Sequence, residues 1–284
     1  MSGDRAFTVL THRRPEETSA AIDELAQAAE RTGIELRFDE DETHKHSLTP
    51  REGFVLDAPM SDDVELCVVL GGDGTILRGL RRYARTEVPV FAVNFGRVGF
   101  LATLDPEQLA EGFRLACSRE FEVMRLPAIE CDGPGGSGLA INDVALHRKA
   151  GERVAELAYV LDGEEVGSVR CDGLVVATPA GSTGYNLANG GPVLAWGVEG
   201  FVVSFIAPHT LTARSLVAAP GSEIVVENRG LEPVEISLDG RPAGEIAPGE
   251  GVPARFLEAA AGLAQLPGTS FYRRLREKFG RLSR

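Results

Sequence analysis

A short glycine-rich turn around one aspartate is the stretch of this sequence best suited to chemistry. Leu70-Gly71-Gly72-Asp73-Gly74-Thr75 closes the apolar run of residues 64–70 and opens a helical stretch near Thr75. Glycines lack a Cβ atom and adopt positive φ, so their N–H groups can point at phosphate oxygens, and the helix N-terminus adds further donors. A carboxylate weakens phosphate binding unless it holds a metal, accepts a proton from a hydroxyl or binds a sugar. Asp73 is therefore the first candidate for chemistry; the alternative is that it only caps the helix.

A second candidate is a pair of adjacent polar residues inside an apolar strand. Asn142 and Asp143 interrupt the predicted strand over residues 139–146. Neighbours in a strand face opposite ways, so at least one of the two points towards a buried or ligand-facing side. An amide and a carboxylate together suit ribose hydroxyls or the edge of a base. The alternative is an exposed edge strand with Asn142 in a bulge.

The densest group of polar residues follows the predicted strand over residues 174–178. Residues 179–192 form a Gly/Ser/Thr turn and a short helix, which bring hydroxyls, N–H groups and one aromatic ring together. Such a turn can hold both a phosphate and a flat ring. Ser182 is not framed as G-x-S-x-G, so the pattern is a weak one for a serine nucleophile. A purely structural turn is the alternative.

The first of these turns requires a parallel sheet to position it. Strand and helix patterns alternate over residues 7–11, 16–31, 34–38, 64–70, 75–85 and 88–93. A β-α-β order of this kind favours a parallel sheet, and ligands bind at the carboxyl edge of such sheets. The strand over residues 88–93 ends there in a second glycine-bearing turn, residues 94–101. The polar residues 39–61 predict a mobile excursion, with a solvated acidic loop at 39–42.

After Phe121 the hydrophobic period changes from about 3.6 to 2, which predicts antiparallel strands. Alternating stretches occur at residues 122–131, 139–148, 154–161, 165–170, 174–178, 200–206, 223–227 and 234–238, while 256–266 fits either a helix or a strand. We therefore predict an α/β domain with a parallel, Rossmann-like sheet over residues 1–121 and a mainly β, sandwich-like domain over 122–268. Residues 269–284 predict a C-terminal amphipathic helix.

Composition and motif context exclude several functions. The net charge of −13 argues against a nucleic-acid partner, since phosphate backbones need a basic face. No signal peptide or apolar stretch long enough for a membrane is visible, so we expect a cytoplasmic protein with no membrane partner. The four cysteines lack the spacing of a metal site, and no metal-ligand residues are predicted. Residues 133–138 match G-x-G-x-x-G but lie between two predicted strands, which favours a hairpin loop.

Taken together, these stretches resemble the NAD kinase family, which phosphorylates the 2′-hydroxyl of the adenosine ribose of NAD to make NADP. The resemblance rests on Gly71-Gly72-Asp73-Gly74-Thr75, on residues 94–101, on Asn142-Asp143 and on residues 172–192, in the family's order. It covers about residues 64–280. The family's fold is an α/β domain followed by a β-rich domain, with the site between them.

The resemblance implies a role for each matching residue. Asp73 would be the catalytic proton acceptor at the ribose hydroxyl, with Gly71, Gly72, Gly74, Thr75 and Arg78 close to the phosphates. Asn142 and Asp143 would hold the ribose and base of NAD. Arg153 and Arg170 would offset phosphate charge, and Asp172 would contact the nicotinamide end of a second subunit's ligand. The adenine pocket would be lined by Thr183, Gly184, Tyr185, Asn186, Leu187 and Ala188.

The sequence also departs from the family pattern. Gly184 and Asp143 stand where many members have alanine and glutamate, which changes pocket size and reach but not the chemistry. Arg241 follows Asp239-Gly240 where many members have a glutamine that touches NAD, which makes Arg241 a candidate contact.

The family implies further ligands and partners. Either ATP or polyphosphate would be the phosphoryl donor, and a homodimer or homotetramer is expected. Mg²⁺ or another divalent cation would bridge the donor phosphates, because the turn carries no lysine to neutralise them. Two alternatives stay open: a lipid kinase of the diacylglycerol or sphingosine kinase type, which shares the glycine turn, and a non-catalytic NAD-binding regulator.

Overall fold

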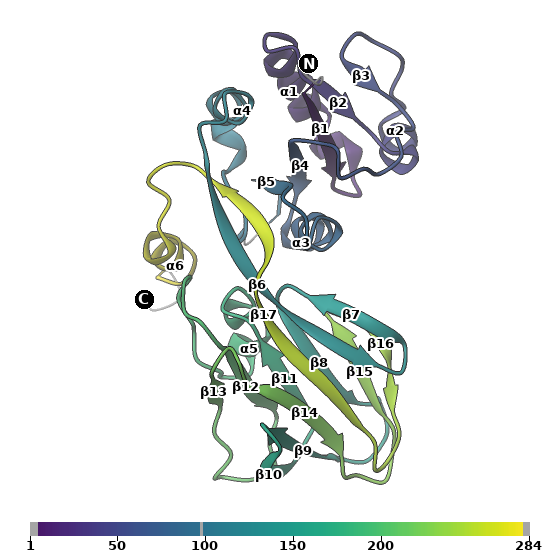
Figure 1. The fold of residues 1–284 in the computed structure, drawn as a ribbon, viewed down its shortest axis with the longest axis vertical. Coiled ribbons are helices and arrows are strands. Elements are labelled where there is room, and N and C mark those ends of the chain that lie inside the picture. Colours follow the sequence, from purple (N-terminus) through teal and green to yellow (C-terminus); the bar gives the residue numbers. More distant parts are fainter. Residues whose placement is uncertain (1–4, 97–98, 281–284) are drawn as a thin grey trace. The chain divides into compact units, whose positions relative to one another are not determined.

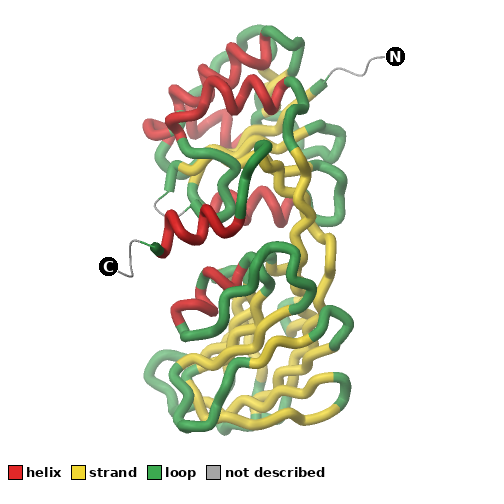
Figure 2. Tube along the Cα trace, turned by 90° about the vertical axis from the view of Figure 1, so that its left-hand side faces the viewer, coloured by secondary structure: helices red, strands yellow, loops and turns green. Residues whose placement is uncertain are grey.

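The structure, a computed structural model, describes residues 5–96 and 99–280 and divides the chain into two compact units. The first unit combines residues 1–125 with residues 261–284, and the second comprises residues 126–260. These boundaries differ from the predicted ones at 121 and 268 because the last strand and helix of the chain return to the first unit. Figure 2 shows most of the helices in the first unit and most of the strands in the second.

The first unit is built on a parallel sheet in the order β5-β4-β1-β2-β3 (Figure 1). Its strands are β1 (Ala6–Thr11), β2 (Glu35–Arg37), β3 (Phe54–Val55), β4 (Leu66–Gly71) and β5 (Pro89–Asn94). The last residues of β17 (Gly251–Gln265) add a further parallel strand beside β5. Every residue of β1, β4 and β5 is buried, as expected for central strands covered on both faces.

Helices cover both faces of this sheet. They are α1 (Ser19–Glu30), α2 (Glu40–His46), α3 (Asp73–Arg82), α4 (Leu109–Cys117) and α6 (Phe271–Phe279), with 3₁₀ turns at Pro15–Glu17 and Pro106–Gln108. The apolar faces of α1 and α4 share one core with Leu66, Val68 and Leu70 of β4. Gly79 of α3 lies against Val69 on the other face, so successive β4 residues serve opposite layers.

The second unit is an antiparallel sandwich of two sheets. Its strands are β6 (Glu122–Gly133), β7 (Gly136–Ala140), β8 (Asp143–Arg148), β9 (Ala155–Leu161), β10 (Glu164–Cys171), β11 (Gly173–Ala177), β12 (Phe201–Ile206), β13 (Leu216–Ala218), β14 (Glu223–Asn228), β15 (Val234–Leu238), β16 (Arg241–Ile246) and β17. One sheet runs β13-β12-β11-β8-β15-β16, and the other joins β10, β9, β14 and β17 with the hairpin β6-β7. A 3₁₀ turn (Gly181–Thr183) and α5 (Tyr185–Ala188) follow β11.

The predicted fold class is confirmed: an α/β unit with a parallel sheet precedes an antiparallel β unit, and a terminal helix follows. The ambiguous stretch at residues 256–266 forms a strand, and the G-x-G-x-x-G stretch lies in the β6–β7 hairpin. The strand predicted over residues 139–148 is divided between β7 and β8, with the break at Ile141 and Asn142.

The prediction of an irregular excursion at residues 39–61 and of a solvated acidic loop at 39–42 was wrong in part. Residues 40–46 form α2, and Phe54–Val55 pairs with β2. Asp39 caps α2 by accepting a hydrogen bond from the backbone N–H of Glu42, at 2.8 Å. Glu42 itself has no exposed surface, so the acidic run is only partly solvated.

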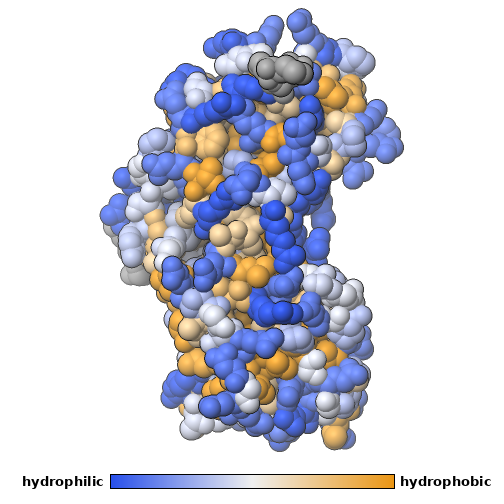
Figure 3. All heavy atoms as spheres, in the orientation of Figure 1, coloured by the Kyte–Doolittle hydropathy of each residue, from blue (hydrophilic) through white to orange (hydrophobic). Residues whose placement is uncertain are grey.

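The surface of the protein is largely hydrophilic, as its many charged residues predict. Hydrophilic side chains cover most of the face drawn in Figure 3, with apolar residues showing between them. Across residues 5–96 and 99–280, no helix combines the length and the apolar character needed to cross a membrane. The four cysteines are free and buried.

Candidate active site

The first glycine turn joins β4 to α3 as the sequence predicts. β4 ends at Gly71, Gly72 is the residue before the helix, and α3 begins at Asp73. A Cβ atom on Gly71 would lie 2.8 Å from the Thr75 side chain, so the turn is too tight for a larger residue. Nothing lies within 4 Å of a Cβ placed on Gly74. The fold therefore does not need a glycine at position 74, which leaves open backbone that a ligand can approach.

The Asp73 carboxylate is held by the second glycine turn and does not cap α3. Its Oδ2 atom accepts a hydrogen bond from the backbone N–H of Gly99 at 3.2 Å, and Oδ1 accepts one from Leu101 at 3.3 Å. Gly72 occupies the capping position without a side-chain bond. Two donors on two oxygens fix the plane of the carboxylate, which stays half-buried rather than enclosed.

The two glycine turns pack against each other through their backbones. The N–H of Phe95 donates to the carbonyl of Gly71 at 3.0 Å, and a Cβ on Gly96 would lie 2.8 Å from the Cα of Gly72. Asn94 braces the second turn: its Oδ1 atom accepts from the Gly96 N–H at 3.0 Å, and its Nδ2 atom donates to Asp105 at 3.0 Å. Arg97 and Val98, which belong to the motif, lie outside the described residues.

A buried carboxylate lies at the carboxyl end of β1, next to the end of β4. Glu42 Oε1 accepts from the backbone N–H of Thr11 at 3.1 Å and Oε2 from its hydroxyl at 2.6 Å. Lys45 and Arg78 donate to the same carboxylate at 2.7 and 2.8 Å. His46 contacts the Thr11 hydroxyl at 2.8 Å. Arg78, which the sequence placed near phosphates, is thus fixed to the sheet while almost half of its side chain stays exposed.

In the second unit, Asn142 and Asp143 lie where β8 begins. Asp239 holds this bend by accepting from the backbone N–H groups of Ile141, Asn142 and Asp143 at 3.1, 2.7 and 3.2 Å. The Oδ1 atom of Asn142 is buried, and no hydrogen-bond partner for it exists among the described residues. Such an unsatisfied acceptor suits a ligand donor. Asp143 is buried, and its burial together with the nearby Asp239 raises the pKa of its carboxyl to about 7.

The polar turn after β11 packs against this bend. A Cβ on Gly181 would lie 2.0 Å from the carbonyl oxygen of Asn142, so only glycine fits there. Ser182 donates its hydroxyl to the carbonyl of Pro179 at 2.7 Å and accepts from the N–H of Leu194 at 2.9 Å. Asn186 is fully buried, and its Nδ2 atom donates to the carbonyls of Ser182 and Pro192, at 3.0 Å each. These two side chains hold the turn.

The remaining residues of this turn differ in exposure. Gly184, Tyr185 and Ala188 are exposed, while Thr183 and Leu187 are partly buried. The Tyr185 ring lies beside the His147 imidazole, with 5.6 Å between ring centroids. A flat ring of a ligand could therefore stack on an aromatic face here. Tyr185 was predicted from the sequence, whereas His147 was not.

The charged residues expected to bind NAD differ in their surroundings. Asp172 accepts a hydrogen bond from Arg148 Nε at 2.6 Å, and this bond lowers the pKa of the Asp172 carboxyl. Arg148 was missed in the sequence because its partner is 24 residues away in the chain. Arg153, Arg170 and Arg241 are exposed.

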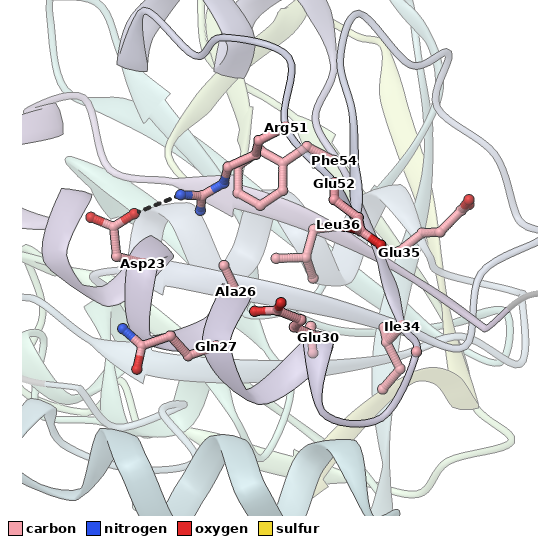
Figure 4. A pocket seen from close by; sticks show the side chains of 13 residues that line it. Asp23, Ala26, Gln27, Glu30, Ile34, Glu35, Leu36, Arg51, Glu52 and Phe54 are labelled. Atoms are coloured by element: carbon pink, nitrogen blue, oxygen red, sulfur yellow. Dashed lines mark hydrogen bonds and ion pairs between the residues drawn. The ribbon is translucent and has the colours of Figure 1, made fainter.

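A pocket of about 680 Å³ lies elsewhere in the first unit, at the amino end of β2 (Figure 4). Arg51 stacks on the Phe54 ring at 3.8 Å and pairs with Asp23 at 3.1 Å. Glu30, Glu35 and Glu52 also line the pocket, so acidic side chains outnumber the single arginine. Its charge and its place at the edge opposite the glycine turns do not suit a phosphate ligand.

A carboxylate fixed beside two glycine turns at a helix N-terminus is an arrangement suited to phosphoryl transfer. Comparisons with known proteins give the class. The family model for the ATP-NAD kinase N-terminal domain matches residues 11–121, and that for the ATP-NAD kinase C-terminal domain matches residues 141–256. An NAD kinase of Rhodopirellula baltica is 35% identical over 224 residues, which cover 77% of this chain and 72% of the relative.

Solved structures agree. The crystal structure of an NAD kinase from Archaeoglobus fulgidus in complex with ATP is 27% identical, with a TM-score of 0.74 and 98% of both chains covered. Yeast NADH kinase complexed with NADH, at 24% identity and a TM-score of 0.86, covers 97% of this chain and 87% of its own and shares the fold. The chain belongs to the NAD kinase family of phosphotransferases. The lipid kinase and regulator alternatives are not favoured.

Proposed function

We propose that the protein transfers the terminal phosphoryl group of ATP to the 2′-hydroxyl of the adenosine ribose of NAD. The hydroxyl oxygen forms a bond to the γ-phosphorus while the bond from that phosphorus to the bridging oxygen of ADP breaks, and NADP and ADP leave. The observation that carries the proposal is the Asp73 carboxylate, fixed by two backbone N–H groups between the two glycine turns.

Asp73 acts on the nucleophile. A ribose hydroxyl is too weak an acid to give up its proton in advance, but a loose phosphoryl-transfer transition state needs little prior deprotonation. Asp73 therefore orients the hydroxyl and accepts its proton late in the step. General-base help of this kind is worth about 10²- to 10⁴-fold in rate. The open backbone at Gly74 and the start of α3 offer N–H donors to the transferring phosphate.

The other assigned residues bind substrate. The exposed part of Arg78 approaches the donor phosphates, and Asn142 and Asp143 accept or donate hydrogen bonds at the ribose and base of NAD. Thr183, Gly184, Tyr185, Leu187 and Ala188 line the adenine site, with Tyr185 and His147 offering their rings, while the fully buried Asn186 holds the turn that carries them. Arg153, Arg170 and Arg241 offset phosphate charge, and Asp172 contacts the nicotinamide end of a ligand shared with a second subunit.

We further propose Mg²⁺ or another divalent cation, use of polyphosphate as a second donor, a homodimer or homotetramer, and a cytoplasmic location. Among the residues that the structure describes, no group of three or more His, Cys, Asp or Glu side chains is arranged to hold a metal ion. Mg²⁺ is usually held by one or two carboxylates together with substrate phosphates and water, so the cation would be held mainly by the phosphates of the donor. When bound, it neutralises their charge.

The test is NADP formation from NAD and Mg²⁺, with ATP and polyphosphate as separate donors, read by an enzyme that reduces only NADP. Asp73→Asn is the key variant. We expect its turnover to fall at least about 10²-fold, because the amide cannot accept the proton, while NAD binding measured by calorimetry stays close to that of the unmodified protein. Unchanged turnover in folded Asp73→Asn protein would remove Asp73 from the mechanism.

A further inference from the structure

The C-terminal helix α6 packs on the same turn that holds Asp73. The Phe100 ring packs near the rings of both Phe271 and Phe279, with centroids 5.8 and 6.0 Å away. Between these two rings along the helix, Arg274 extends its guanidinium group to the turn. Its Nη1 atom donates to the carbonyl oxygen of Phe100 at 2.8 Å and also to that of Ala102. Residues 99–102 are thus held from a point more than 170 residues later in the chain.

One peptide group connects Arg274 with Asp73. The carbonyl of the Phe100–Leu101 peptide accepts from Arg274, and the N–H of the same peptide donates to Asp73 Oδ1 at 3.3 Å. A cation at the oxygen end of an amide draws electrons towards that oxygen and makes the N–H a stronger donor. The second Asp73 donor, the Gly99 N–H, comes from the same short turn.

We propose that Arg274 is a positioning residue for phosphoryl transfer, acting through the Phe100–Leu101 peptide to aim and strengthen the hydrogen bond that holds the Asp73 carboxylate. The inference rests on the proposed function of Asp73 as proton acceptor. The motifs around residue 73 do not include Arg274, and the two family models match residues 11–121 and 141–256.

The surroundings of Arg274 favour a role for its charge as well as for its packing. Burial lowers the pKa of the guanidinium group, and this effect is opposed by the carboxylates of Asp105, Glu277 and Asp73. A largely enclosed cation costs desolvation energy, and a neutral side chain could hold the helix on the turn without that cost. A carboxylate that must stay oriented nearby gives the retained charge a function.

The experiment compares two variants of this residue with two controls in the full-length protein. Arg274→Gln keeps a polar side chain with an N–H donor but removes the charge, and Arg274→Lys keeps the charge. Arg273→Gln removes the same charge from the exposed neighbouring position on α6. Phe279→Ala weakens the packing of α6 on Phe100 without touching the guanidinium group. For each protein, kcat and the KM values of NAD and ATP are measured, and folding is checked by circular dichroism.

We expect Arg274→Gln to lower kcat about 10- to 100-fold, because a misplacement of a catalytic group by roughly 1 Å costs up to about 10²-fold. The KM values of both substrates should stay close to those of the unmodified protein, since Asp73 is not needed to bind them. Arg274→Lys should recover most of kcat, whereas Arg273→Gln should leave kcat unchanged. Phe279→Ala should lower the melting temperature, while its kcat should fall less than that of Arg274→Gln.

Three outcomes would overturn the proposal. The first is that Arg274→Gln keeps the kcat of the unmodified protein. The second is that Arg274→Gln and Phe279→Ala both lower kcat and raise both KM values, which would indicate a purely structural role. The third is that folded Arg274→Lys loses about 10- to 100-fold in kcat, the loss expected for Arg274→Gln. If Arg274→Gln does not fold, the lysine variant decides alone. Absence of NADP formation by the unmodified protein would instead refute the proposed function, so the two failures are distinguishable.

Discussion

Replacing Asp143 by asparagine should stabilise the protein, and by more at alkaline than at acidic pH. Burial and the neighbouring Asp239 raise the pKa of the Asp143 carboxyl to about 7, whereas an aspartate in the unfolded chain titrates near 4. Between these two values the folded protein binds the additional proton, so stability falls as the pH rises through this window and stays lower above it. The difference corresponds to about 4 kcal/mol, which is the cost of ionising this buried group.

Urea unfolding of the unmodified protein and of Asp143→Asn, at about pH 5 and about pH 8, measures this cost, because the asparagine cannot ionise. The stability advantage of the variant should grow by about 2–3 kcal/mol from the lower to the higher pH, because an aspartate in the unfolded chain is already largely ionised at pH 5 and part of the difference has been lost there. Asp172→Asn is the matched control: Arg148 lowers the pKa of Asp172, so this variant should lose a similar amount of stability at pH 5 and at pH 8, and the loss should shrink only below about pH 4, where an aspartate in the unfolded chain takes up its proton. An advantage of Asp143→Asn that is equal at both pH values would refute the reasoning.

Two further substitutions test the frame of the site. Glu42→Gln should destabilise the protein by about 1–3 kcal/mol and raise the KM of ATP, because Arg78 loses its anchor; Glu40→Gln, at an exposed position of the same helix, should do neither in urea unfolding and kinetics. Gly96→Ala should cost about 1–3 kcal/mol, since its Cβ would lie 2.8 Å from Gly72 Cα. Gly74→Ala, where nothing lies within 4 Å of the Cβ, should keep full thermal stability. Equal melting temperatures of the two alanine variants would contradict the close packing of the turns.

The fold was largely predictable because its signals are local. The buried runs of β1, β4 and β5 and the change of period after Phe121 can be recognised within a few residues of sequence. The short helix α2 was missed because its residues are nearly all polar, although Asp39 followed by Glu42 three positions later is a helix-start pattern. Its burial comes from Thr11 and Arg78, and no local pattern announces such partners.

The candidate site was predictable only where residues carry a motif. Asp73 and its glycines stand together in the sequence, and so do Asn142 and Asp143. What holds them comes from far along the chain: Asp239 lies almost 100 residues after the bend that it supports, and Arg274 lies beyond every motif. Contacts of this kind depend on how the elements pack, which the order of residue types does not specify.

The return of the chain to the first unit has a consequence for its synthesis. Because residues 261–284 supply a strand beside β5 and the helix under Phe100, the first unit lacks part of its own structure until the end of the chain has left the ribosome. The second unit, which is one continuous segment, can fold earlier. Once residues 126–260 have emerged from the ribosome but residues 261–284 have not, the chain carries a β unit that is able to fold and an α/β unit whose carboxylate turn still lacks Arg274.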